Sequence, residues 1–236
     1  MAFLMDWDKA GEHLYETGVS RGVLYVVDPS KTGANKYGKG VEWNGLTSVS
    51  ESPEGAEASA IYADNIKYLN LMSAEDFKGT IEAYTYPDEF GVCDGSDNLL
   101  TGVKIGQQAR RMFGLCYRTE IGNDESQTHG YKIHLIYNCL ASPSERSYET
   151  INDSPEAITF SWEFNTTPVN VANKKPTALV TVDSTALDPA KLALLEAALY
   201  GTDDSSTISS ISAKITAYTG QPMLLLPDEI VTLLSA

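Results

Sequence analysis

Short stretches rich in β-branched and aromatic residues recur from residue 22 to residue 183, separated by clusters of Gly, Pro, Asn and Asp. This pattern predicts strands joined by turns. We expect at least seven strands, at residues 22–28, 64–72, 79–86, 111–118, 131–139, 157–164 and 177–183. A chain of 236 residues can bury a sizeable core without disulfides or a metal. The sequence therefore predicts a mainly β fold with flanking α structure.

Two of these stretches alternate as half-buried antiparallel strands do. In 79–86, one face carries Ile81, Ala83 and Thr85, and the other carries Glu82, Tyr84 and Tyr86. In 157–164, one face carries Phe160, Trp162 and Phe164, opposite Ser161 and Glu163. Two such apolar faces packed together make a β-sandwich or a barrel-like fold.

Helical signals are concentrated at the C-terminal end. Within the β region only residues 87–90 suit a short flanking helix, because Pro and acidic residues favour a helix N-terminus. After residue 187, Asp188 as N-cap, Pro189 and a final Gly201 frame a helix over 190–200. A strand at 211–218 and a short helix in 224–234 are expected to follow. Residues 188–236 thus form a helix-strand-helix appendage to a domain at 1–187.

Three segments are longer than simple connections require. They are an N-terminal arm at 1–20, an extended loop at 28–45 and a loop at 119–130. Loops of this length are usually functional or disordered. The loops at 28–45 and 119–130 are therefore candidates for contact with another subunit. We expect the arm at 1–20 and the loop at 28–45 to be mobile in the free chain and to become ordered when copies assemble.

The formal net charge of −15 and a pI near 4.5 argue against ordinary nucleic-acid binding, which depends on Lys and Arg. The N-terminus lacks the basic start and apolar core of a signal peptide or membrane span, which predicts folding in the cytosol. Cys93, Cys116 and Cys139 form an odd set with no C-x-x-C pair, so we expect buried, reduced thiols.

No catalytic, cofactor-binding or metal-binding residue is expected. Residues 33–40 match G-x-x-x-x-G-K, but Gly40 replaces the Ser or Thr that would hold Mg²⁺, and residues 41–53 cannot form the required helix. The three histidines (His13, His129 and His134) have no serine elbow of the G-x-S-x-G kind beside them. The cysteines are too far apart for a zinc site.

Two readings based on carbohydrate chemistry stay open from the residues alone. Glu82, Glu163 and Asp183 are strand acids that could form a glycosidase pair, although acids on polar strand faces are expected in an acidic protein. The many tyrosines and tryptophans could instead bind a sugar. Trp7, Trp43 and Trp162 are too dispersed along the chain to form an evident platform.

Several segments, taken in order, resemble the major tail proteins that build the tail tubes of long-tailed (siphovirus-type) bacteriophages. They are residues 41–53 (VEWNGLTSVSESP), 57–71 (EASAIYADNIKYLNL), 80–90 (TIEAYTYPDEF), 106–119 (GQQARRMFGLCYRT) and 154–162 (SPEAITFSW). The resemblance covers roughly residues 10–187, and LPDEIVTLL near the C-terminus is similar to the ending of some relatives.

This resemblance implies a β-sandwich with one flanking helix, whose subunits form hexameric rings stacked into a hollow tube for DNA ejection. It implies a structural protein of the virion, assembled in the host cytoplasm, with no catalysis and no membrane. The implied partners are copies of the same chain, the tape measure protein, the tail terminator and the baseplate proteins.

The acidic charge is consistent with such a tube, because a negative wall would let DNA slide without binding. We therefore expect some of the acids to face the lumen. The alternatives are another ring-forming virion protein, such as a tail terminator, baseplate or decoration protein, and a carbohydrate-binding β-sandwich.

Overall fold

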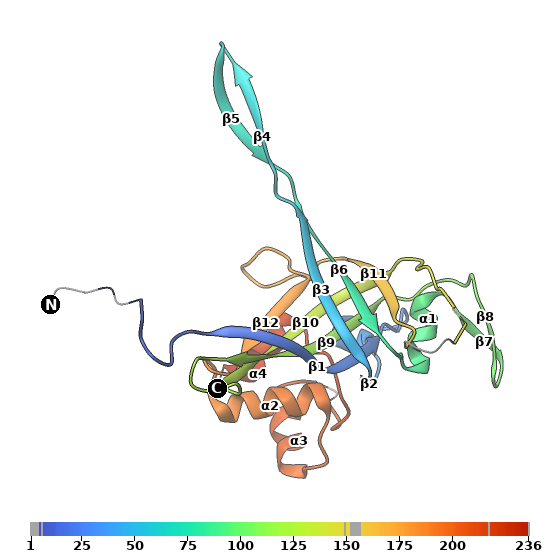
Figure 1. Ribbon diagram of the computed structural model, residues 1–236. Helices are drawn as coiled ribbons and strands as arrows, with labels where there is room; N and C mark the ends of the chain where they lie inside the picture. The colour runs from blue at the N-terminus through green and yellow to red at the C-terminus, as the bar shows by residue number, and fades with distance from the viewer. Residues whose placement is uncertain (1–4, 6, 149, 152–156, 217, 236) are drawn as a thin grey trace.

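The protein is mainly β with a few helices, as the computed structural model in Figure 1 shows for residues 5, 7–148, 150–151, 157–216 and 218–235. Eight strands form one antiparallel sheet in the order β2-β1-β9-β10-β11-β6-β3, with β12 paired to β10 beside this path. Their bounds are β1 Tyr15–Val26, β2 Val41–Trp43, β3 Leu46–Gly55, β6 Glu75–Ala83, β9 Phe113–Gly122, β10 Gly130–Ala141, β11 Phe160–Thr166 and β12 Leu179–Asp183.

The sheet curls into a barrel-like form. Its path begins with β2 and ends with β3, yet these two strands are consecutive in the chain and only Asn44 and Gly45 separate them. The first and last strands therefore lie next to each other. Gly45 adopts a φ of 80°, a left-handed conformation that glycine tolerates without strain.

Aromatic side chains fill the inside of this curled sheet. Trp43 from β2 packs against Phe90 and Trp162, with ring centroids 4.6 and 5.9 Å away. Phe90 belongs to the 3₁₀ turn Asp88–Phe90, which continues into the short helix α1 (Gly91–Asp94). The expected alternation is confirmed within the strands, because Ile81, Ala83, Trp162 and Phe164 are all buried in this inner core. It is wrong beyond Ala83, where β6 ends: Thr85 is exposed, and Tyr86 packs against the inner core.

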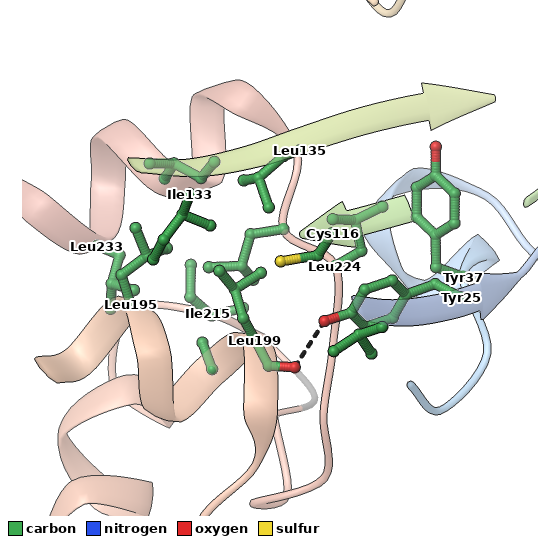
Figure 2. Close-up of a cluster of buried hydrophobic side chains, with 14 of the residues drawn as sticks. Tyr25, Tyr37, Cys116, Ile133, Leu135, Leu195, Leu199, Ile215, Leu224 and Leu233 are labelled. Carbon is green, nitrogen blue, oxygen red and sulfur yellow. Dashed lines mark hydrogen bonds between the residues drawn. The ribbon is translucent and has the colours of Figure 1, made fainter. Parts of the chain in front are cut away.

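A second core lies between the outer face of the sheet and three C-terminal helices (Figure 2). The helices are α2 (Pro189–Tyr200), α3 (Ser205–Ser212) and α4 (Pro227–Leu234). Side chains from β10, including Ile133 and Leu135, belong to the same buried cluster as Leu195 and Leu199 of α2. The Tyr25 hydroxyl of β1 donates a hydrogen bond of 2.6 Å to the Leu199 carbonyl. Residues 188–236 therefore share a core with the sheet.

The seven expected strands all exist, with shifted ends, and the helices expected at 190–200 and within 224–234 are confirmed. The strand expected at 211–218 is wrong, because α3 covers part of it. Ile208, Ile211 and Ile215 recur at helical spacing, and Asp204 caps the helix by accepting a 2.8 Å hydrogen bond from the Thr207 backbone.

The expected N-terminal arm and the expected loop at 28–45 both contribute residues to the barrel. Residues 15–20 of the expected N-terminal arm belong to β1, and residues 1–4 and 6 lie outside the described residues. The loop at 28–45 contains a 3₁₀ turn (Gly33–Lys36) and β2. Tyr37 in this loop is buried, and its hydroxyl donates a 3.0 Å hydrogen bond to Asn138 Oδ1.

Candidate assembly interface

A two-stranded hairpin projects far from the barrel (Figure 1). It consists of β4 (Ala58–Ala63) and β5 (Ile66–Met72), and we call residues 58–72 the projecting hairpin. Its turn residues, Asp64 and Asn65, have φ values of 52° and 64°. Two successive positive φ values are the signature of a tight hairpin turn whose twist matches the flanking strands.

Both faces of the projecting hairpin carry exposed apolar side chains. Alternation along β5 places Ile66, Tyr68 and Met72 on one face, and each is at least 64% exposed. The opposite face carries Leu69 and Leu71 together with Ile61, the register partner of Leu69. An isolated antiparallel hairpin gains nothing from two exposed apolar faces. This arrangement is typical of a surface that a partner covers.

The projecting hairpin is also electrically neutral in a strongly acidic chain. Asp64 and Lys67 are its only charged residues, whereas the whole chain has a formal charge of −15. Two copies of such a chain repel one another over most of their surface. The projecting hairpin lets a second copy approach without that penalty.

A second, shorter hairpin carries exposed apolar side chains elsewhere on the molecule. It is formed by β7 (Asp97–Leu100) and β8 (Val103–Ile105), and Leu99, Leu100 and Val103 are exposed. Lys104 Nζ donates a 2.7 Å hydrogen bond to Asp88 Oδ1, which ties this hairpin to the turn before α1. Figure 1 shows the two hairpins projecting in different directions.

A polar cluster joins β3 to the opposite wall of the barrel. The Tyr117 hydroxyl of β9 donates a hydrogen bond to Glu51 Oε1, and His134 Nδ1 of β10 lies 3.3 Å from the same oxygen. The His134 ring stacks on the Tyr117 ring with centroids 4.7 Å apart, and its Nε2 lies 3.0 Å from Thr119 Oγ1. His134 and Tyr117 together hold the pKa of Glu51 below its ordinary value.

This cluster brings a carboxylate, an imidazole and two hydroxyls into contact, and the spacing of these residues along the chain does not predict it. Glu51 lies more than sixty residues before the other members. The other two histidines lie apart from the cluster: His13 is exposed and lies 3.4 Å from Asp124, and His129 lies 3.5 Å from Asn123.

The remaining residues that the sequence singled out are placed as follows. Gly33–Lys36 forms a 3₁₀ turn, and β2 rather than a helix comes after residue 40. Cys93, Cys116 and Cys139 are free and buried, as expected. Burial raises the pKa of Cys93 and of Cys116 to about 12, which keeps both as unreactive thiols at neutral pH.

The three strand acids are only partly brought together. Glu82 and Glu163 lie on adjacent strands, where Glu82 opposes Ser161 and Glu163 opposes Thr80, so the two are diagonal neighbours on one face. Asp183 lies on β12 and its carboxylate accepts hydrogen bonds from the backbone and hydroxyl of Thr185. Asp183 therefore caps a turn and takes no part in that pair.

Among the described residues, no group of three or more His, Cys, Asp or Glu side chains is arranged to hold a metal ion. The helices in the described part of the chain are all too short or too polar to span a membrane.

No family model and no curated protein matches the chain. Solved structures that are similar to it at low TM-scores include the following three. A chain of the anti-feeding prophage (AFP) baseplate has a TM-score of 0.37 and 9% identity, covering 75% of this chain and 97% of that one. A chain of the sheath-tube complex of an extracellular contractile injection system (PVC), in the extended state, has a TM-score of 0.28 and 10% identity, covering 69% of this chain and 88% of that one. A chain of the PVC sheath/tube terminator, in the extended state, has a TM-score of 0.28 and 10% identity, covering 76% of this chain and 99% of that one.

Proposed function

We propose that this chain is a tail tube subunit of a long-tailed bacteriophage, and that its copies form rings, six to a ring, which stack into the conduit for DNA ejection. Several segments between residues 10 and 187 resemble the major tail proteins in the same order along the chain, and this resemblance supports the proposal. The barrel-like sheet with flanking helices is compatible with it. In this proposal the protein acts through its interfaces and has no catalytic role.

The observation that carries the proposal is the projecting hairpin. Tyr68 and Met72 on one face, and Leu71 on the other, are more than half exposed in the single chain. Full burial of a fully exposed Leu or Met side chain contributes about 1.5–3 kcal/mol, and covering these partly exposed side chains contributes a corresponding fraction of that. Because both faces are apolar, the hairpin is suited to lie between surfaces of other subunits, as a stacked assembly would require.

The charge of the chain fits a DNA conduit. Its excess of acidic residues would make the inner wall of a tube repel the phosphate backbone, so that DNA passes without being held. The proposed partners besides further copies are the tape measure protein, the tail terminator and the baseplate proteins. The proposed location is the virion tail, after assembly in the host cytoplasm.

Negative-stain electron microscopy over a protein concentration series, with light scattering for the soluble form, tests the proposal. Uniform hollow tubes would support a tube subunit. Single rings that never extend would instead favour a terminator, baseplate or other ring-forming virion protein. A chain that stays monomeric at all concentrations, and also fails to join tubes grown from an initiating ring complex, would overturn the proposal.

A further inference from the structure

A groove beside β2 is basic, which is unusual on this acidic protein. It has a volume of about 620 Å³, and residues of the loop before β2 line it together with residues 218, 219 and 221–223. Lys31 and Lys39 are its charged lining residues, and the polar groups of Thr32, Asn35 and Gln221 surround them. None of the lining residues is acidic. We call this surface the basic groove.

The positive charges of the two lysines in the basic groove are at most weakly neutralised within the chain. Lys31 Nζ lies 3.6 Å from Asp28 Oδ2, in an exposed pair of the kind that contributes little. Lys39 is exposed, and no carboxylate of the described residues lies within ion-pair distance of its nitrogen. The basic groove can therefore receive an acidic group.

The place where the projecting hairpin leaves the barrel has the opposite character. Four exposed acids gather there on β3, β6 and the segment before β4, and we call them the acidic base: Glu54, Glu57, Glu75 and Asp76. Glu54 and Asp76 are direct register partners. Lys78 Nζ compensates only part of this charge, through a 2.6 Å contact with Glu54 Oε2.

Like charges placed directly opposite each other in a sheet are destabilising. In the single chain this repulsion acts between Glu54 of β3 and Asp76 of β6, which are exposed and make no contribution to the buried core. Cationic side chains from outside would relieve the repulsion. The same chain carries such cations in the basic groove.

The two surfaces lie on different sides of the molecule. The basic groove is lined in part by residues between α3 and α4, and the Gly40 amide beside it donates a 3.0 Å hydrogen bond to the Pro222 carbonyl. The acidic base lies where the projecting hairpin leaves the barrel, away from the C-terminal helices (Figure 1). Complementary surfaces at separate places on one molecule make a head-to-tail contact, which can repeat without limit or close into a ring.

We propose that the basic groove of one copy receives the acidic base of the next copy. This inference rests on the self-assembly proposed above and names the surfaces that meet. A second copy is the favoured occupant because its acidic base matches the groove in charge, and its neutral projecting hairpin can continue along the neighbour's surface. The charged contact sets the register, and the apolar hairpin supplies most of the affinity.

Charge reversal of each surface, alone and in combination, tests the contact. One variant carries Lys31→Glu and Lys39→Glu, and the other carries Glu57→Lys and Glu75→Lys. Each alone is expected to raise the concentration at which assembly begins by about tenfold, because attraction becomes repulsion. An equimolar mixture of the two should restore assembly, since each reversed surface then meets a complementary one.

A matched control reverses two exposed lysines elsewhere, Lys174→Glu and Lys175→Glu, with the same change in net charge. This control should assemble as the unaltered chain does. Thermal melting of every variant shows whether it is folded, and all the altered side chains are exposed. Normal assembly of both reversed variants, or loss that the mixture does not restore, would contradict the contact.

Zero-length carbodiimide cross-linking of a mixture of isotope-labelled and unlabelled chains separates this inference from the proposed function. Mass spectrometry should find cross-links between different copies that join Lys31 or Lys39 to an acid of the acidic base. Tubes that form without such cross-links would refute the contact and leave the tube function standing. A concentrated chain with neither tubes nor these cross-links would refute both.

Discussion

Glu51 of β3 is held by side chains that come from the far wall of the barrel. In the sheet order, β11 and β6 separate β3 from β10, so the contacts of Glu51 with Tyr117 and His134 cross the barrel interior. Beyond Glu51, every residue of β3 is exposed. The cluster is therefore the last fixed point of the strand before it leaves the barrel toward the projecting hairpin.

Replacing Glu51 by Gln should destabilise the folded chain by about 1 kcal/mol at pH 7, because Tyr117 loses a charged acceptor in a half-buried setting. The folded-state pKa of Glu51 lies below its ordinary value of 4.5. The stability it contributes is thus present above that value and is lost as the pH falls through the lowered pKa.

Urea unfolding of both chains from pH 7 to pH 3 checks this, at concentrations below those needed for assembly. The difference between them should shrink below about pH 4.5. Glu145→Gln, an exposed change, serves as the control and should alter stability little at any pH. A constant difference across the whole range would mean that ionisation of Glu51 plays no part.

The sequence predicts residue environments well where a single strand decides them. The alternation of Phe160, Trp162 and Phe164 correctly assigned a buried face, because side chains on one strand alternate whatever the partner is. The Glu51 cluster could not be predicted in this way. Its members come from three strands, and their meeting depends on how the sheet curls.

The projecting hairpin places apolar residues on both of its faces, and this leads to a prediction about elements. Two pairs of substitutions separate the faces: Ile61→Ser with Leu69→Ser, and Tyr68→Ser with Met72→Ser. Each pair should raise the concentration needed for assembly by at least about tenfold, because each face loses buried apolar area. Analytical ultracentrifugation measures that concentration.

The same four residues contribute nothing to the barrel core, so neither pair should lower the melting temperature of the monomer appreciably. A pair of substitutions on Leu99 and Val103 to Ser tests whether the shorter hairpin has the same role. If only one face of the projecting hairpin affects assembly, the hairpin lies on a partner rather than between two.

Helix α3 shows why one element was predicted wrongly. Residues 202–210 are rich in Ser and Thr, which are weak helix formers, and the strand expected at 211–218 follows this stretch. In the structure, the hydroxyls of Ser209, Ser210 and Ser212 donate to carbonyl groups one turn earlier. The apolar spacing of three and four residues was the better signal.

Asp204 is expected to control the start of α3. The hydroxyl and backbone groups of Thr207, with the Ser206 hydroxyl, hold the pKa of Asp204 at about 2. Asp204→Ala should speed amide exchange of residues 205–212 at pH 7, whereas Asp204→Asn, which keeps a capping oxygen, should do so less. The capping stability is present above the ordinary pKa of 3.8 and is lost as the pH falls toward 2.

At the scale of the whole molecule, residues 188–236 are bound to the rest of the chain by a shared core. Leu195 and Leu199 of α2 belong to the same buried cluster as Tyr25 of β1 and Ile133 of β10 (Figure 2). The Tyr137 hydroxyl also donates a 2.9 Å hydrogen bond to the Leu225 carbonyl. The boundary expected at residue 187 rests on the change of pattern along the chain, which carries no information about which faces meet.

This shared core predicts that sheet and helices unfold together. Leu195 is fully buried, so Leu195→Ala should destabilise the protein by about 2–5 kcal/mol. Near-ultraviolet circular dichroism, which reports the aromatic inner core, and far-ultraviolet circular dichroism should still give one coincident transition at a lower denaturant concentration. Val231→Ala, at an exposed position of α4, should shift neither transition.

If the helical signal is lost first while the aromatic signal stays native, then 188–236 is a separate cooperative unit. The sheet's outer face, with Tyr25 and Ile133, would then be stable when uncovered, and the C-terminal segment could be removed without unfolding the barrel.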